Sequence, residues 1–303
     1  MKRHGQTRQW TKFSSNSPKP QTPYPSLKGP DAAEGQKSLF SNIWEHGLVF
    51  LPETPPTTEA TIEILNTLGP IRHTHYGGFW DFTSEVNPID TAYTNLSLPL
   101  HTDNSYFTEP AGLQLFHLLS HMPSTTESPQ PGDFDPSLGG ESTFSDGFAA
   151  AAALYHIDKK AYETLANTGI VFTAEGSPAG TFRNDLSTRP RGHPVLGHNS
   201  TRAHYSPDHL TQIRWNNCDR SALTRFSGHD IMLDWYRAAK LWDELLSSGD
   251  FEVEVKLQPG EPVVFDNWRI LHGRKKFEGK RRMCGAYIGM DDFKAGAGRL
   301  GVL

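Results

Sequence analysis

An alternation of apolar and charged residues near the C-terminus is the feature that most limits the fold of this chain. Between residues 251 and 257, Phe, Val, Val and Leu alternate with Glu, Glu and Lys. This period of two predicts a β-strand with one buried face. Pro259-Gly260 then favours a turn into a second apolar run over 262–265. The 303 residues include 27 glycines and 22 prolines, and this turn-rich composition also favours a β-fold.

Helical patterns are fewer and lie outside that strand-rich part. An alanine-rich segment predicts a helix over 148–167, and a stripe of apolar residues predicts another over 229–247. Shorter patterns predict a strand over 47–51 and a helix that opens within 55–58 and runs to about residue 68. No internal repeat or linker interrupts this part of the chain. We therefore expect one β-rich domain over 38–303 with helices at its periphery.

The first 37 residues differ in composition from the rest. Residues 1–30 contain six Lys or Arg and five prolines but no Asp or Glu. Because prolines oppose an amphipathic helix, we expect a disordered basic tail over 1–37. Organelle transit peptides share this charge bias, whereas a secretion signal would need an apolar stretch that is missing here. A cytoplasmic location is therefore expected, with mitochondria as the alternative.

Charge and cysteine content argue against several classes of protein. The net charge is −5 with neutral His, which argues against nucleic-acid binding. The longest apolar run, 148–155, is far shorter than the roughly 20 residues that a membrane helix needs. With only two cysteines, the chain has neither a disulfide framework nor a cysteine-based zinc site. We expect a small-molecule partner, no nucleic acid and no membrane.

Two histidines and one aspartate have the pattern of a metal site. Residues 98–103 end an apolar stretch, and in a strand His101 and Asp103 point to the same side. A third ligand, His272, follows a core strand much later in the chain. Two imidazoles and one carboxylate on one face of an octahedron leave positions open for a chelating cosubstrate and O2. The sequence therefore predicts an Fe(II) site for dioxygen chemistry.

Other histidines are weaker candidates for metal ligands. His156 and Asp158 lie in a predicted helix, where positions i and i+2 point in different directions. His117 has the surroundings of a core-strand residue. His73 and His75 share the right spacing but have no carboxylate beside them.

A basic segment near the C-terminus favours an anion site. Seven Lys or Arg lie between residues 269 and 282, with Glu278 as the one acid among them. A strand after Gly279 would place Arg281 on the same face as Met283, Gly285 and Tyr287. An arginine on this inner face would bind a dicarboxylate bidentately. Arg282 remains a rival because the register is not fixed at this point.

Together, these motifs resemble the Fe(II)/2-oxoglutarate dioxygenases of the taurine-dioxygenase superfamily, and within it the branch of trimethyllysine and γ-butyrobetaine dioxygenases. This resemblance implies a mainly β fold, a double-stranded β-helix or jelly-roll core with flanking α-helices. The stretches that carry it are YGGFW at 76–80, the segment 90–117, GGESTFSDGF at 139–148, RWNNCDR at 214–220 and the segment 265–287.

The resemblance also implies residue roles. It assigns the metal to His101, Asp103 and His272, and the distal carboxylate of 2-oxoglutarate to Arg281 and Ser142. An aromatic box for a quaternary ammonium suits such a cation, because ring faces attract it without hydrogen bonds. Position 90 would attract an α-ammonium and repel a carboxylate. The implied substrate-binding residues are Tyr76, Trp80 and Tyr93 for the box, Asp90 for the ammonium and Asn216 for the carboxylate.

The implied activity is hydroxylation of N6,N6,N6-trimethyllysine at C3, the first step of carnitine biosynthesis. It would use Fe(II), 2-oxoglutarate and O2, with ascorbate as reductant. Three alternatives stay open: a paralogous oxygenase acting on γ-butyrobetaine or another amino acid, an inactive jelly-roll binding protein, and a basic interaction module. A cysteine-rich zinc module usual in the family has no counterpart here, which leaves a homodimer in doubt. The long loop 122–138 is expected to be a solvated insertion or a lid.

Overall fold

The computed structural model describes residues 7–14, 17–84, 94–177, 180–183, 192–199, 205–222 and 229–303. The helices are α1 Ala32–His46, α2 Thr58–Leu68, α3 Gly147–Ile157, α4 Lys159–Asn167, α5 His229–Leu246 and α6 Met290–Arg299, with 3-10 turns at Tyr24–Leu27, Pro136–Leu138 and Pro207–His209. The strands are β1 Leu48–Phe50, β2 Ile71–Arg72, β3 Trp80–Ser84, β4 Leu98–His101, β5 Leu113–Met122, β6 Ser142–Asp146, β7 Thr173–Ser177, β8 Gly180–Arg183, β9 Leu196–His198, β10 Leu210–Ile213, β11 Val253–Val255, β12 Val263–Asp266, β13 Ile270–Arg274 and β14 Lys280–Ile288.

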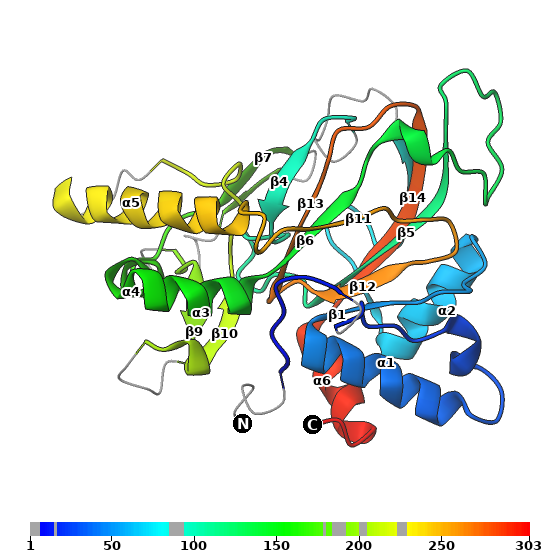
Figure 1. Ribbon diagram of the computed structural model, residues 1–303, viewed down its shortest axis with the longest axis horizontal. Helices are drawn as coiled ribbons and strands as arrows, with labels where there is room; N and C mark the ends of the chain where they lie inside the picture. Colours follow the sequence, from blue (N-terminus) through cyan, green and yellow to red (C-terminus); the bar gives the residue numbers. More distant parts are fainter. Residues whose placement is uncertain are drawn as a thin grey trace.

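Two antiparallel sheets form the centre of the fold (Figure 1). The larger has the order β1-β12-β5-β14-β2, with β3 also paired to β14, and the smaller has the order β11-β6-β13-β4. Their apolar faces share one core, in which Phe144 of β6 contacts Phe265 of β12 at 5.8 Å between ring centroids. The prediction of a mainly β fold with flanking helices is confirmed.

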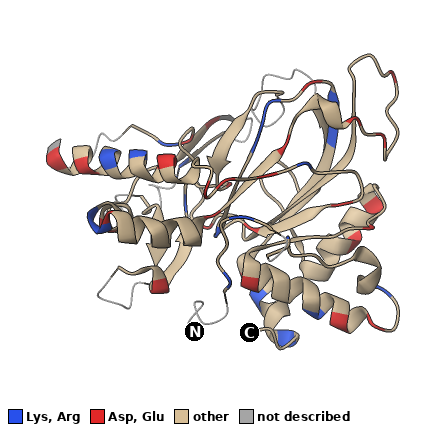
Figure 2. Cartoon of the chain, in the orientation of Figure 1, with Lys and Arg blue, Asp and Glu red and all other residues tan. Residues whose placement is uncertain are grey.

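Helices cover the two ends of this sandwich (Figure 1). α1, α2 and α6 pack on the larger sheet through a second core that includes Phe40 and Phe293, whose rings stack at 5.4 Å. α3, α4 and α5 share a third core with the β9–β10 hairpin, centred on Trp215 and Trp235. Along α5 both charge signs occur (Figure 2). Among the described helices, none combines the length and the apolar character needed to cross a bilayer.

The described N-terminal residues differ from the expected disordered tail over 1–37. Trp10 is buried, its backbone N–H donates to Asp146, and its indole N–H donates to the carbonyl of His46. Tyr24 and Leu27 are buried in the helix-covered core, and α1 already begins at Ala32. A few large apolar side chains among the prolines anchor this segment, so the domain boundary expected at residue 38 comes too late.

The alanine-rich segment forms two helices rather than one. α3 ends at Ile157, and Asp158 starts α4 because its carboxylate accepts a hydrogen bond from the backbone N–H of Ala161. The loop 122–138 folds back along the C-terminal half of β5, where His121 exchanges backbone hydrogen bonds with Asp133 and Asp135.

Candidate metal centre and active site

Two neighbouring strands carry the predicted metal ligands. His101 ends β4 and His272 lies in the middle of β13, and the antiparallel register places these two residues opposite each other. Asp103 follows two residues after His101. Its backbone N–H donates to Asn267 Oδ1 at 2.8 Å, and Asn267 Nδ2 donates back to the Asp103 carbonyl at 3.0 Å. The chain direction after β4 is therefore fixed by the turn between β12 and β13.

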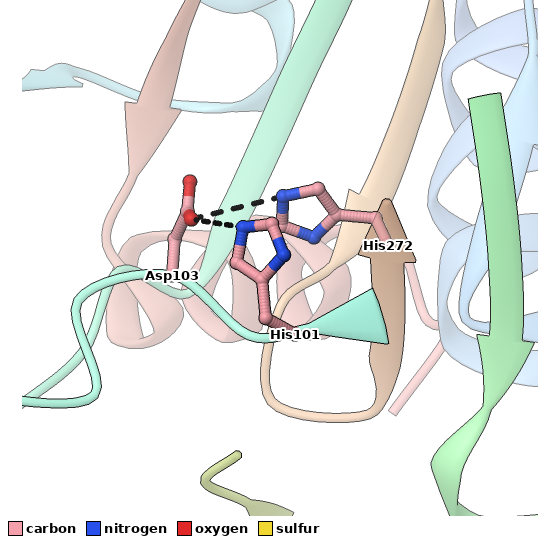
Figure 3. Close-up of side chains that lie close together, drawn as sticks. All are labelled: His101, Asp103 and His272. Atoms are coloured by element: carbon pink, nitrogen blue, oxygen red, sulfur yellow. Dashed lines mark ion pairs between the residues drawn. The ribbon is translucent and has the colours of Figure 1, made fainter. Parts of the chain in front are cut away.

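The three side chains converge on one point (Figure 3). Asp103 Oδ1 lies 3.2 Å from His101 Nε2 and 3.7 Å from His272 Nε2. One ligand atom from each residue lies within 4.8 Å of the others, the one such cluster found among the described residues. Neighbouring ligands bonded to a common ion at about 2.1 Å lie about 3 Å apart. The spacing thus fits a single bound cation.

Hydrogen bonds orient these ligand atoms. His101 Nδ1 lies 2.8 Å from the carbonyl of Pro99, which leaves Nε2 directed at the centre. Asp103 Oδ2 accepts from Gln114 Nε2 and from the Tyr287 hydroxyl, each at 2.7 Å. Because both donors use Oδ2, Oδ1 is the oxygen that faces the two imidazoles.

Charge and burial keep the carboxylate ionised. Burial alone would raise the pKa of Asp103, but the nearby histidines and its hydrogen bonds hold that pKa well below the usual range. Burial, followed by the charge of His101, lowers the pKa of His272 to about 3. For His101, burial acts downward, but the hydrogen bond and charge of Asp103 outweigh it and raise the pKa. Asp103 and His272 are thus held in the protonation states that bind Fe(II), whereas a protonated His101 would release its proton when the metal binds.

Arg281 lies on the inner face of β14, as the strand pattern predicted. It is 5% exposed, and its guanidinium lies 5.8 Å from the centre of the Phe277 ring. Among the described residues, no acidic side chain forms an ion pair with it. Burial, followed by the charge of Arg274, lowers the pKa of Arg281 to about 9, so the group is still a cation at neutral pH.

Arg282 faces the opposite side of β14. Its Nη2 lies 2.6 Å from Asp81 Oδ2 and its Nε donates to Oδ1 at 2.9 Å, in a surface ion pair. The structure thereby separates the two rival arginines by face. Ser142 begins β6, is 6% exposed and is the cross-strand neighbour of Arg274.

Two of the predicted aromatic-box residues are described. Trp80 packs on Phe116 at 5.6 Å, and Phe116 packs on the His272 ring at the same distance. The Tyr76 hydroxyl lies 3.5 Å from that of Tyr106. Tyr93 and Asp90 lie outside the described residues.

Asn216 lies in a turn next to the metal cluster. Its Nδ2 donates to Asp219 at 2.8 Å, while its Oδ1 accepts from the backbone N–H of Cys218 at 3.1 Å. The preceding residue, Trp215, exchanges hydrogen bonds with Thr102, which lies between His101 and Asp103 just after β4. The amide is therefore close to the site but is engaged within its own turn.

The sequence reasoning missed the residues that support Asp103. Gln114 is the second residue of β5, between Leu113 and Leu115, and nothing in its immediate surroundings distinguishes it from a solvent-facing strand residue. Tyr287 could have been predicted to lie near the site, because strand periodicity placed it on the same face as Arg281. Asn267 follows β12 directly, and its role depends on the path of residues 103–111, which no local pattern predicts.

Similarity to known proteins is consistent with this geometry. In sequence, the chain is 39% identical over 304 aligned residues to a trimethyllysine dioxygenase of Neurospora crassa, covering 94% of this chain and 62% of that protein. It is 33% identical to the human mitochondrial trimethyllysine dioxygenase, covering 89% of this chain and 58% of that protein. The chain thus spans about three fifths of the length of these relatives.

In structure, the chain is similar to AAD-2 in complex with Mn(II) and N-oxalylglycine, with a TM-score of 0.58, 14% identity, and coverage of 93% of this chain and 96% of that one. A model of one protein family, described as taurine catabolism dioxygenase TauD, TfdA family, matches residues 17–287. Since this match covers most of the described fold and all the residues of the metal cluster, the chain belongs to the TauD, TfdA family of dioxygenases.

Proposed function

We propose that this protein is an Fe(II)- and 2-oxoglutarate-dependent oxygenase that hydroxylates N6,N6,N6-trimethyllysine at C3, the first step of carnitine biosynthesis. The observation that carries the proposal is the convergence of His101, Asp103 and His272 on the same side of the fold as Arg281, a buried cation without an acidic partner among the described residues. The names of the relatives support the substrate.

His101, Asp103 and His272 would hold Fe(II) through two Nε2 atoms and Oδ1. When bound there, Fe(II) with 2-oxoglutarate and O2 supplies the oxidising power for hydroxylation, while the substrate C–H is placed by the protein. Asp103 keeps one oxygen available because Gln114 and Tyr287 occupy the other. The low pKa of His272 keeps its imidazole neutral and available as a ligand.

Arg281 would bind the distal carboxylate of 2-oxoglutarate, with Ser142 as a further donor. A buried guanidinium is costly without an anion, and a bidentate carboxylate removes that cost. Arg282 is a poor alternative because Asp81 already pairs with it at the surface.

Tyr76 and Trp80 would contribute ring faces for the trimethylammonium, an interaction of roughly 0.5–2 kcal/mol for each ring. Tyr93, Asp90 and Asn216 remain predicted substrate-binding residues. A carboxylate at position 90 favours trimethyllysine over γ-butyrobetaine, because it attracts an ammonium and repels a carboxylate.

The proposal extends to the cellular location, the reductant and the partners of the protein. The names of mammalian relatives favour mitochondria over the cytoplasm. Ascorbate as reductant, a homodimer and the absence of nucleic-acid binding stay predictions.

Product analysis tests the proposed function. The purified chain is incubated with Fe(II), ascorbate, 2-oxoglutarate and either trimethyllysine or γ-butyrobetaine, and both succinate and the hydroxylated product are measured. We expect one succinate per 3-hydroxytrimethyllysine and much less product from γ-butyrobetaine. The variant His101→Ala should form neither. Metal binding without turnover identifies an inactive binding protein, and preferred turnover of γ-butyrobetaine identifies the paralogous activity.

A further inference from the structure

A buried serine on the strand next to Arg281 has a hydroxyl without a hydrogen-bond partner. Ser84 ends β3 and is 6% exposed. No donor or acceptor in the described part of the chain bonds to its Oγ. Buried serine hydroxyls are nearly always hydrogen-bonded, because a polar group taken out of water without a partner is costly. A ligand that accepts a hydrogen bond from Ser84 would remove this cost.

The strand register places Ser84 in one row with Arg281 and His121. β14 lies between β3 and β5, and Arg281 pairs with Ser84 on one side and with His121 on the other. Figure 1 shows β5 and β14 side by side. Residues directly opposite each other in antiparallel strands share a face, with Cβ atoms about 4.5–5.5 Å apart. This face is the inner one, because Phe82, two residues before Ser84, packs against the core between the sheets.

His121 completes the row without adding a charge. It is 1% exposed, and its Nε2–H donates to the carbonyl of Glu278 at 2.8 Å. Burial lowers the pKa of His121 to about 4, so its imidazole is neutral at pH 7. Its ring meets the Phe277 ring edge to face at 5.6 Å, and the Arg281 guanidinium lies over the same ring. The row therefore offers an anion one cation, on Arg281, and one uncommitted hydroxyl, on Ser84.

We propose that Ser84 is a further cosubstrate-binding residue, whose hydroxyl donates a hydrogen bond to the distal carboxylate of 2-oxoglutarate beside Arg281. This inference rests on the proposed function, because it requires Arg281 to bind that carboxylate. A carboxylate has about four acceptor positions, and a bidentate arginine uses two of them. The hydroxyl of Ser84 can therefore bind at the same time as Arg281, and a position remains for Ser142 from the smaller sheet.

Equilibrium binding measures the contribution of the hydroxyl. The full chain is loaded with Mn(II) under nitrogen and titrated calorimetrically with 2-oxoglutarate and with 2-oxopentanoate, which has a methyl group in place of the distal carboxylate. We expect Ser84→Ala to bind 2-oxoglutarate about tenfold more weakly, because hydrogen bonds to charged acceptors are strong. The affinity for 2-oxopentanoate should stay the same, since this ligand offers the hydroxyl no acceptor.

Thermal unfolding separates a ligand-binding serine from a structural one. Removing a hydroxyl that bonds to no other group of the protein does not destabilise the fold. The melting temperature of Ser84→Ala without ligand should therefore equal or exceed that of wild type. The rise in melting temperature that 2-oxoglutarate produces should become smaller, because stabilisation by a ligand follows its affinity.

Thr83→Ala is the matched control. Thr83 is exposed on the outer face of β3, opposite Arg282, so the variant removes a hydroxyl from the same strand but not from the row. It should keep both dissociation constants. Wild-type affinity for 2-oxoglutarate in Ser84→Ala overturns the inference, and so does an equal loss for the two 2-oxo acids. A lower melting temperature of Ser84→Ala without ligand also overturns it, because the hydroxyl would then have a structural role.

Failure of the proposed function would look different. In that case the wild-type chain loaded with Mn(II) would not bind 2-oxoglutarate, or would bind the two 2-oxo acids equally well. If wild type prefers 2-oxoglutarate and Arg281→Gln does not, the cosubstrate pocket stands. The comparison of Ser84→Ala with Thr83→Ala then decides the inference alone.

Discussion

Replacing Tyr287 by Phe tests how the candidate metal ligand Asp103 is held. The Tyr287 hydroxyl donates to Asp103 Oδ2 at 2.7 Å, while Gln114 donates to the same oxygen from β5. The substitution removes one oxygen atom and leaves the ring, which is 5% exposed, to fill the same space. The carboxylate then has a single donor to set its orientation toward His101 and His272.

The expected loss follows from the charge of the acceptor. A hydrogen bond to a charged group contributes about 1.5–3 kcal/mol. Here Gln114 remains, so the lower part of this range applies. About 1.5 kcal/mol corresponds to a roughly tenfold weaker metal affinity, at the low end of the losses typical for residues that support metal ligands. The pKa of Asp103 should also rise toward its ordinary value, because a donor to the ionised form is lost.

Titration with Mn(II) at pH 7 measures this effect, with 2-oxoglutarate omitted so that only the protein ligands contribute. Tyr236→Phe is the matched control, since its hydroxyl lies on the outside of α5 near Arg220. We expect about tenfold weaker binding for Tyr287→Phe and no change for the control. A metal affinity within twofold of wild type, in a variant with an unchanged melting temperature, would refute the role given to this hydrogen bond.

Three further predictions concern folding. Burial lowers the pKa of His117 to about 4, so the unfolded chain takes up its proton first as pH falls from about 6.5 and native stability falls with it. His117→Gln should reduce the slope of unfolding free energy against pH near pH 5 by about 1.4 kcal/mol per unit, and an unchanged slope in urea titrations would contradict this. Asp146→Ala should cost about 3–5 kcal/mol by leaving Arg269 buried without its anion; a loss under 1 kcal/mol in the same titrations would be the contrary result. Gly285→Ala should lower the melting temperature, because a Cβ there would lie 1.9 Å from the backbone oxygen of Leu115 and 2.4 Å from the Trp80 ring; a wild-type melting curve would show that both neighbours make room for the methyl group at no cost.

Strand periodicity explains why much of the site could be predicted. A side chain that follows another by an even number of residues in a strand shares its face, and this pattern correctly placed Tyr287 on the face of Arg281. The same argument paired His101 with Asp103, but β4 ends at His101, and hydrogen bonds between the Asp103 backbone and Asn267 direct Asp103 to the cluster instead. What the pattern does not give is the register between distant strands. His272 was a candidate for the third ligand because it follows a core strand, and the resemblance to a known family then assigned it to the metal.

Contacts between distant segments explain what the sequence did not reveal. Trp10 is held by Asp146 and by the carbonyl of His46, and neither partner is visible from a basic, proline-rich segment. The break between α3 and α4 did have a local signal in the sequence. Asp158 is a favoured N-cap residue, and its carboxylate accepts a hydrogen bond from the backbone N–H of Ala161. The sequence predicted one continuous helix because the residues on both sides of Asp158 have high helix propensity.

Three buried arginines differ in the groups that contact their guanidiniums. Arg269 is 1% exposed and is neutralised by Asp146, with its remaining donors on the carbonyls of Glu45 and Arg8. It therefore needs no ligand. Arg274 is oriented by carbonyl oxygens, and no acidic side chain of the described part of the chain pairs with Arg281. At Arg281, on the face of the metal cluster, the distal carboxylate that we propose as its ligand would offset the cost of burying the guanidinium.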